Sequence, residues 1–151
     1  MREKSRREIL ALGAAGAALG LGGEMRPVAA TPSEAAAEIA KFTGGKATQK
    51  GNISIDLPEI AENGNTVPLA ITVDSPMTAD DHVSDILVVA EGNPHPRIAT
   101  FQLTPLSGRA EAATRIRMAA TQNIVVVVKT STGKFFTEQK QVKVTIGGCG
   151  G

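Results

Sequence analysis

The sequence predicts an all-β fold, an antiparallel sandwich of about seven strands, on the strength of three observations. Between residues 44 and 146, apolar residues recur at every second position in short runs, which is the period of a half-buried strand. Turn signals rich in Gly, Pro, Asn and Ser separate these runs at fairly regular spacing. No helix-length pattern interrupts the runs. This spacing is typical of an immunoglobulin-like sandwich, here without the disulfide or core Trp of antibody domains, because the chain has one Cys and no Trp.

The first thirty residues have the layout of an export signal. A basic start is followed by a weakly hydrophobic stretch rich in Ala, Gly and Leu, and then by small residues at Val28-Ala29-Ala30. The run Ser5-Arg6-Arg7-Glu8-Ile9-Leu10 resembles a twin-arginine signal, which exports folded proteins. We therefore expect residues 1–30 to be a twin-arginine signal peptide and the mature protein to be periplasmic. We expect no membrane anchor, because Gly dilutes the roughly 20 apolar residues that a span needs.

Residues 31–43 predict a short N-terminal helix. Thr31 can cap it, Pro32 suits the first helical position, and Glu34 stands where a capping-box acid belongs. Apolar residues keep helical spacing until Gly44 and Gly45 end the pattern. Such a helix needs an apolar surface to lie on.

Residues 44–146 form the predicted sandwich. Its strands are expected around residues 53–57, 67–73, 86–90, 99–103, 114–118, 124–128 and 142–146. Pro68 favours an edge strand or a strand start, because proline cannot donate a ladder hydrogen bond. In the run 114–118, Arg115 and Arg117 are expected on the face opposite to Ile116 and Met118.

Composition excludes several classes of function. Residues 1–30 hold five of the 16 Lys and Arg and three of the 15 Asp and Glu, so 11 basic and 12 acidic residues remain in the mature chain. Such a near-neutral chain has no general electrostatic reason to bind nucleic acid or an anionic membrane. One Cys and two His offer few ligands for a transition metal. We expect no cofactor and no catalytic activity of the chain's own.

The chain reads Gly147-Gly148-Cys149-Gly150-Gly151 after the last expected strand. We expect residues 147–151 to be a flexible, swinging arm, since glycine tails gain little from packing and lose much entropy when ordered. Small neighbours would let the sulfur of Cys149 enter a narrow site on another protein. No Lys or Arg follows Lys143, so activation of the thiol would have to come from that partner. A tail with an incidental Cys is the less favoured interpretation, because an unused thiol is a liability in an oxidising compartment.

Four segments together with this arm resemble the SoxY family, the sulfur carriers of the thiosulfate-oxidising Sox system. They are Val88-Val-Ala-Glu-Gly-Asn-Pro94-His-Pro96, Phe101-Gln-Leu-Thr-Pro105-Leu-Ser-Gly108, Thr114-Arg-Ile-Arg-Met118 and Val142-Lys-Val-Thr-Ile-Gly-Gly-Cys149. The resemblance covers essentially the whole chain. The glycine-bracketed terminal Cys is its most specific element.

The resemblance implies a non-catalytic covalent carrier. Cys149 would be the attachment site and would hold thiosulfate as a cysteine S-thiosulfonate, with Gly147, Gly148, Gly150 and Gly151 giving the arm its flexibility. It also implies partners: the Sox Z subunit in a SoxYZ heterodimer, a haem-containing enzyme that joins thiosulfate to the carrier, a hydrolase that releases sulfate and, where present, a sulfane dehydrogenase.

Two alternatives remain beside the carrier. Cys149 could serve a periplasmic structural or redox module that forms an intermolecular disulfide. The second alternative is a ubiquitin-type sulfur carrier that uses the Gly151 carboxylate. The export signal speaks against it, because such a carrier must be adenylated by ATP and an exported protein meets no ATP.

Weaker signals favour ordinary structural roles. Asp80-Asp81-His82 is one short cluster without spaced partners, so a solvated loop is favoured over a metal site. His95 could act as a base toward Cys149, and Arg115 and Arg117 could attract a sulfur oxyanion. An exposed turn and a solvent face are the favoured interpretations. Ser107 lacks the surroundings of a nucleophile elbow.

Overall fold

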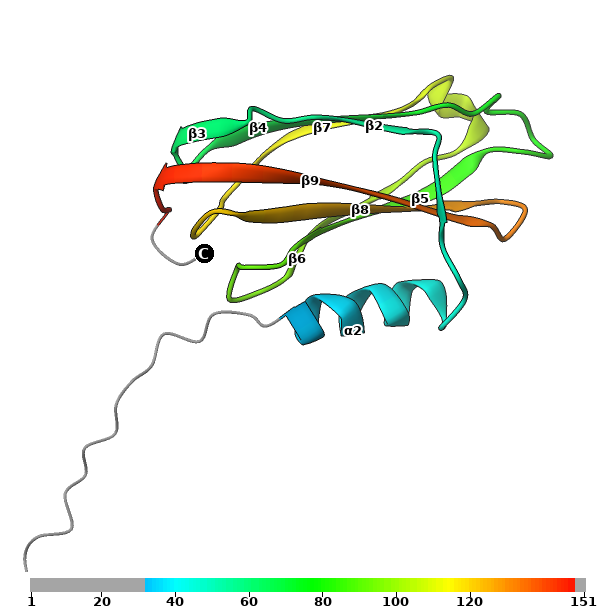
Figure 1. The fold of residues 1–151 in the computed structure, drawn as a ribbon. Coiled ribbons are helices and arrows are strands. Elements are labelled where there is room, and N and C mark those ends of the chain that lie inside the picture. Colours follow the sequence, from blue (N-terminus) through cyan, green and yellow to red (C-terminus); the bar gives the residue numbers. More distant parts are fainter. Residues whose placement is uncertain (1–31, 149–151) are drawn as a thin grey trace, which may run out of the picture.

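The computed structural model describes residues 32–148 and shows a β-sandwich with one short helix (Figure 1). The elements are α2 Pro32–Thr43, β1 Gln49–Lys50, β2 Ile53–Asp56, β3 Ile60–Asn63, β4 Val67–Val73, β5 Val83–Ala90, β6 Arg97–Gln102, η1 Pro105–Ser107, β7 Ala110–Ile116, β8 Gln122–Thr130 and β9 Phe135–Ile146. The predicted all-β class and the N-terminal helix are confirmed. Residues 1–31, which include the predicted signal peptide and the predicted cap Thr31, lie outside the described residues.

The strands form two sheets. The larger has the order β1-β9-β8-β5-β6, and β3 also pairs with β9; the smaller has the order β2-β4-β7. Pairs within the two sheets are antiparallel except those of β1 and β3, which run parallel to β9. β9 is 12 residues long, so both short strands can pair with it without overlapping: β1 near its start and β3 near its end. The predicted antiparallel sandwich is confirmed, and these two short strands are parallel additions to it that the sequence does not predict.

Those two strands are also the ones that the alternation of apolar residues does not predict. β1 is two exposed residues, and β3 buries Ala61 alone. Their positions depend on pairing with β9 rather than on a buried face of their own. Proline at position 68 is the second residue of β4, and β2 pairs with β4 only from Ala70 onward. Pro68 therefore lies at a strand start, as predicted, within the central strand of the small sheet.

The main core lies between the two sheets. Its buried apolar side chains come from β4, β5, β7, β8 and β9, and they include Ile71, Ile86, Ile124, Val126 and Val142. Alternate residues of β8 point into this core. Those between them, Val125 and Val127, point to the other face of the large sheet.

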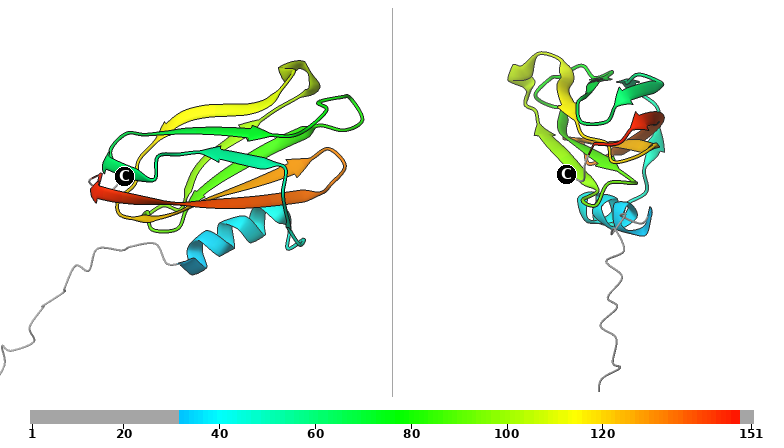
Figure 2. Two further views of the ribbon diagram at one scale, coloured as in Figure 1. Left: turned by 45° about the horizontal axis from the view of Figure 1, so that its top comes forward. Right: turned by 90° about the vertical axis from the view of Figure 1, so that its left-hand side faces the viewer.

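Helix α2 covers that other face. Ala35, Ile39 and Phe42 pack against a second cluster formed by Leu87, Val89, Val125 and Val127, and Figure 2 shows the helix lying along the large sheet. Both faces of β5 and β8 are therefore buried, which explains why their sequences are continuous apolar runs rather than alternating ones. The helix ends where predicted: Gly44 has φ 62°, and the amide of Gly45 donates to Ala40 O at 3.1 Å.

One end of the sandwich gathers the turns that matter for the site. The turn after β3 (residues 64–66), the turn after β5 (91–96), the loop after β7 (117–121) and the residues after β9 (147–148) are joined there by hydrogen bonds. We call this set the C-terminal loop cluster.

Candidate functional site

Cys149, Gly150 and Gly151 lie outside the described residues. The structure describes the chain up to Gly148, the residue to which Cys149 is bonded. The described part of the site is the region of the C-terminal loop cluster that receives Gly147 and Gly148.

Backbone hydrogen bonds hold the segment that leads to the cysteine. The amide of Gly64 donates to Ile146 O at 2.8 Å, and the amide of Met118 donates to Gly64 O at 2.7 Å. The amide of Gly148 then donates to Met118 O at 3.0 Å, and Gly148 is buried. Three segments far apart in the sequence are thus tied to one another at the point where β9 ends.

The glycines at this point are needed for space. A Cβ atom on Gly147 would run into the carbonyl oxygen of Ala119, and one on Gly64 would run into that of Met118. A Cβ on Gly148 would lie 3.0 Å from Gly64 O. These atoms belong to backbone and cannot swing away. None of the three glycines has a φ that only glycine adopts readily, so close approach of the backbone is the reason for glycine here.

Gly147 and Gly148 are the two residues of the expected arm that the structure describes. Their flexibility stays a prediction, but the argument that a residue without a side chain has nothing to pack does not hold for them. In the structure Gly148 is buried and hydrogen-bonded, and Gly147 lies against Ala119. The missing side chain is what lets these two backbone segments approach so closely.

Two polar side chains hold the loop that receives Gly148. Asn93 Nδ2 donates to Arg117 O at 2.8 Å, and Asn93 Oδ1 accepts from the amide of Ala119 at 3.0 Å. Gln122 Nε2 donates to Asn93 Oδ1 at 2.8 Å and to Ala120 O at 3.1 Å, while Gln122 Oε1 accepts from the amide of Gly92. Gln122 is one of three buried polar residues among those described, with 6% of its surface exposed. The loop is therefore fixed on both sides of Met118.

The sequence alone does not mark these positions as part of a site. Asn93 lies within the segment 88–96 that carries the resemblance, but a turn residue gives no sign of a partner 24 or 26 residues away. Gln122 is detectable as the first of two polar residues, Gln122 and Asn123, that precede the apolar run 124–128. Nothing in the sequence around Gly64 marks it as a point of close backbone approach.

The weaker candidates lie elsewhere or on the surface. Arg115 and Arg117 are exposed and Ile116 and Met118 are buried, as the alternation predicted. His82 Nδ1 lies 3.0 Å from Thr78 O, and because a carbonyl only accepts, this nitrogen carries the proton. Within residues 32–148, no group of three or more His, Cys, Asp and Glu side chains could hold a metal ion. The structure places no metal site at Asp80, Asp81 and His82.

His95 lies exposed in the turn after β5, beside a small ionic cluster. Glu38 of α2 pairs with Arg97 at 2.9 Å and with Lys41 at 3.0 Å. The hydrogen bond from Lys41 is the main cause that lowers the pKa of Glu38, and Arg97 adds to it. The pair with Arg97 joins the helix to the edge strand β6. Together with His95, these side chains line a shallow surface hollow.

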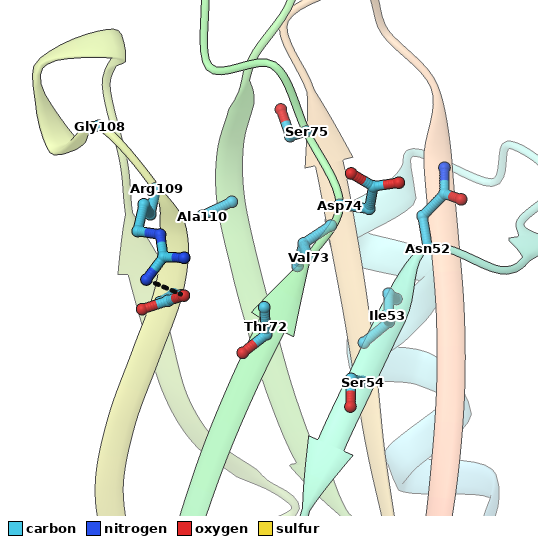
Figure 3. Close-up of a pocket in the computed structure, with 11 residues that line it drawn as sticks. Asn52, Ile53, Ser54, Thr72, Val73, Asp74, Ser75, Gly108, Arg109 and Ala110 are labelled. Atoms are coloured by element: carbon cyan, nitrogen blue, oxygen red, sulfur yellow. Dashed lines mark ion pairs between the residues drawn. The ribbon is translucent and has the colours of Figure 1, made fainter.

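A larger open depression, of about 590 Å³, lies at the opposite end of the sandwich (Figure 3). It is lined by the ends of β2, β4 and β7, and an exposed ion pair of 3.3 Å joins Arg109 to Glu111 at its side. Ser107 is in the neighbouring turn, where its hydroxyl accepts from the amide of Thr104 at 3.2 Å. β4 runs from the loop cluster at Val67 to this depression at Val73, so the two are separated by the length of a strand.

No helix among the described residues is long and apolar enough to cross a membrane. A comparison with curated proteins gave no match.

The family "Sulfur oxidation protein SoxY" matches residues 39–149. The solved structure of the sulfur carrier protein SoxY from Chlorobium limicola f thiosulfatophilum is 35% identical, with a TM-score of 0.65 over 77% of this chain and 100% of that one. A superoxide reductase (neelaredoxin) from Ignicoccus hospitalis is 15% identical, with a TM-score of 0.56 over 78% and 95% of the two chains. A putative superoxide reductase from Thermotoga maritima is 16% identical, with a TM-score of 0.54 over 68% and 89%.

At such low identity the likeness to the two reductases shows a common fold alone. The SoxY match is different in kind, since it covers most of the sequence and includes the cysteine at position 149. The chain belongs to the SoxY family, and its role is that of a sulfur carrier of the Sox system.

Proposed function

We propose that this protein carries sulfur intermediates of thiosulfate oxidation covalently on the thiol of Cys149 and presents them to partner enzymes in the periplasm. The observation that carries the proposal is that the SoxY family match runs through residue 149, the only Cys in the chain. The anchoring of Gly148, the residue before it, supports the same proposal. Gly148 itself lies at one end of the sandwich, among the turns of the C-terminal loop cluster.

The proposed loading step is an oxidation. The Cys149 thiol and thiosulfate, S₂O₃²⁻, form a sulfur–sulfur bond and yield Cys–S–S–SO₃⁻, one proton and two electrons. A haem protein of the partner enzyme accepts the electrons. Water then cleaves the outer sulfur–sulfonate bond and gives sulfate, two protons and Cys–S–S⁻. The carrier contributes the thiol, and the partner enzymes contribute the chemistry.

The remaining parts of the proposal concern location and partners. Residues 1–30 act as a twin-arginine signal, so the chain is exported folded. It functions as a heterodimer with a Sox Z subunit, which would cross the membrane with it. Family membership supports Sox partners in general. The paired Arg6 and Arg7 support the export route.

The intact mass of the mature protein from cells oxidising thiosulfate tests the proposal. We expect a reductant-labile mass increase made of sulfur or sulfonate units, mapped by peptide analysis to Cys149. The Cys149→Ser variant is the control, and it should show no adduct and no thiosulfate-dependent turnover while it keeps its fold.

Two outcomes would contradict the proposal. One is turnover retained by Cys149→Ser. The other is a bare thiol, or only a protein–protein disulfide, during active thiosulfate oxidation. The latter would favour the intermolecular disulfide module instead.

A further inference from the structure

We propose that Gly64, Met118, Gly147 and Gly148 form a backbone clamp, braced by Asn93 and Gln122, which fixes the position from which Cys149 is presented to partner enzymes. This inference rests on the proposed carrier function and deepens it. It assigns a positioning role to residues that the family match does not single out. The clamp replaces part of the free arm that the glycine-rich sequence suggests.

The first step is that the hydrogen bonds form a closed path. They run from the end of β9 at Ile146 to Gly64, from Gly64 to Met118, and from Met118 back to Gly148. The chain after β9 is thus held on both sides of Gly147. A single bond at Ile146 would leave the next residues free to pivot, whereas a second bond two residues later fixes their direction.

The second step is that the path leaves no room for side chains. A Cβ on Gly147 would run into the carbonyl oxygen of Ala119, and a Cβ on Gly64 would run into that of Met118. Both obstacles are backbone atoms of the same loop, residues 117–121. The clamp therefore depends on how firmly that loop is held.

The third step is that Asn93 and Gln122 hold that loop. Asn93 bonds to the peptide groups on both sides of Met118, at Arg117 O and at the Ala119 N–H. The second of these peptide groups carries the Met118 carbonyl that receives Gly148, so the acceptor itself is held in place. Gln122 in turn holds the side chain of Asn93, because Gln122 Nε2 donates to Asn93 Oδ1. No described buried side-chain nitrogen or oxygen is left without a hydrogen-bond partner. Loss of either side chain would break that arrangement.

The fourth step connects the clamp to function. Consecutive Cα atoms lie about 3.8 Å apart across a trans peptide bond, so a fixed Gly148 sets where Cys149 begins. Without the clamp, a partner enzyme that binds the carrier would have to order Gly147 and Gly148 itself, at a cost in conformational entropy. The clamp removes part of that cost before the two proteins meet.

Asn93→Ala tests the brace, with Asn123→Ala as its matched control. Asn123 lies beside the same turn and donates to Glu91 at 2.8 Å, but it makes no side-chain bond to the loop 117–121. Hydrogen exchange is measured at the Gly148 amide, with the amide of Val126 in the centre of β8 reporting global unfolding. We expect Gly148 to exchange about 10-fold faster in Asn93→Ala, beyond any change at Val126, and to be unaffected in Asn123→Ala.

Kinetics of thiosulfate loading by the haem-containing partner enzyme provide the functional measurement. With the carrier as the varied substrate, Asn93→Ala should raise KM about 5-fold and leave kcat nearly unchanged, because the thiol chemistry is intact. Asn93→Asp keeps the acceptor oxygen and loses the donor to Arg117, so it should lie between wild type and Asn93→Ala. If Asn93→Ala does not fold, Gly147→Ala tests the clamp without altering the side chains of Asn93 and Gln122 that brace it.

The outcomes separate the clamp from the carrier function. A wild-type Gly148 amide that exchanges as fast as an unstructured glycine overturns the clamp. Equal KM values for Asn93→Ala and Asn123→Ala overturn its role in presentation, whereas loading of the wild type still supports the carrier function. Failure of the wild type to take up thiosulfate, with Gly148 protected, overturns the carrier function alone.

Discussion

Glycine serves two different physical purposes in this chain. At Gly44 it provides a left-handed turn after α2, with φ 62° and open space around the position of a Cβ. At Gly64 the backbone angles are ordinary, and the side chain is excluded because the Met118 carbonyl occupies its place. Substitutions at the two positions should therefore carry costs of different origin and size.

Gly64→Ala should destabilise the protein by about 1–3 kcal/mol, since backbone must shift to admit the new methyl group. Gly44→Ala should cost about 1 kcal/mol, the penalty for a left-handed conformation without a clash. Urea unfolding of the two variants and the wild type measures the difference. A smaller loss at position 64 than at position 44 would show that the Met118 carbonyl is not a fixed obstacle.

At the scale of elements, α2 is held mainly by apolar packing on the large sheet. Phe42 contacts Phe135 edge to face, with ring centroids 6.1 Å apart at 77°, and Ile39 packs on the same cluster. The exposed ion pairs of Glu38 add a polar contact to β6. Packing and charge should therefore respond differently to mutation and to pH.

Phe42→Ala should lower the free energy of unfolding by about 2 kcal/mol, from lost apolar burial and the lost ring contact. The exposed Lys41→Ala nearby is the control and should change it by less than about 0.5 kcal/mol. Thermal and denaturant unfolding followed by circular dichroism provide both values. Equal effects of the two substitutions would contradict the packing described for Phe42.

The lowered pKa of Glu38 gives a pH dependence of known sign. Because its pKa is lower in the folded protein than its ordinary 4.5, the charged pairs stabilise the fold above pH 4.5. That contribution is lost as the pH falls through the lowered value. The Tm difference between wild type and Glu38→Gln should be small, largest near pH 7, and absent in strong acid. A difference that grows as the pH falls below 4.5 would contradict the sign.

At the scale of the whole molecule, the limits of sequence-based prediction follow from how each part is specified. Apolar alternation predicts β4 and β7 because each buries one face, and apolar runs predict β5 and β8 because both faces are buried. β1 and β3 bury almost nothing of their own, so only their pairing with β9 reveals them. The role of Cys149 stays a prediction, made from its glycine neighbours in the sequence. The anchoring of Gly148 could not be predicted, since it depends on bonds between distant segments.

Truncation measures what that anchoring contributes. A chain ending at Gly148 keeps the bond to Met118, whereas a chain ending at Ile146 loses it and keeps only the bond from Gly64. The shorter chain should be less stable by about 1 kcal/mol, the net value of one hydrogen bond. Comparison of the two denaturation midpoints tests this, and coincident midpoints would argue against the anchored position of Gly148.

The parallel pairing of β3 with β9 has a consequence for the order in which the chain can fold as it is synthesised. β9 follows every other described strand in the chain, and Lys140 on it donates to Leu57 O across 83 residues. β1, β3 and the segment that carries Leu57 must therefore wait for β9 to be synthesised, and such long-range closure is a slow step in folding. Gly64 and Met118 are synthesised earlier, but they gain their hydrogen bonds to Ile146 and Gly148 only after β9 has been synthesised. Anchoring of Gly148 thus marks a chain whose folding is complete, which is the state that the proposed twin-arginine route would require.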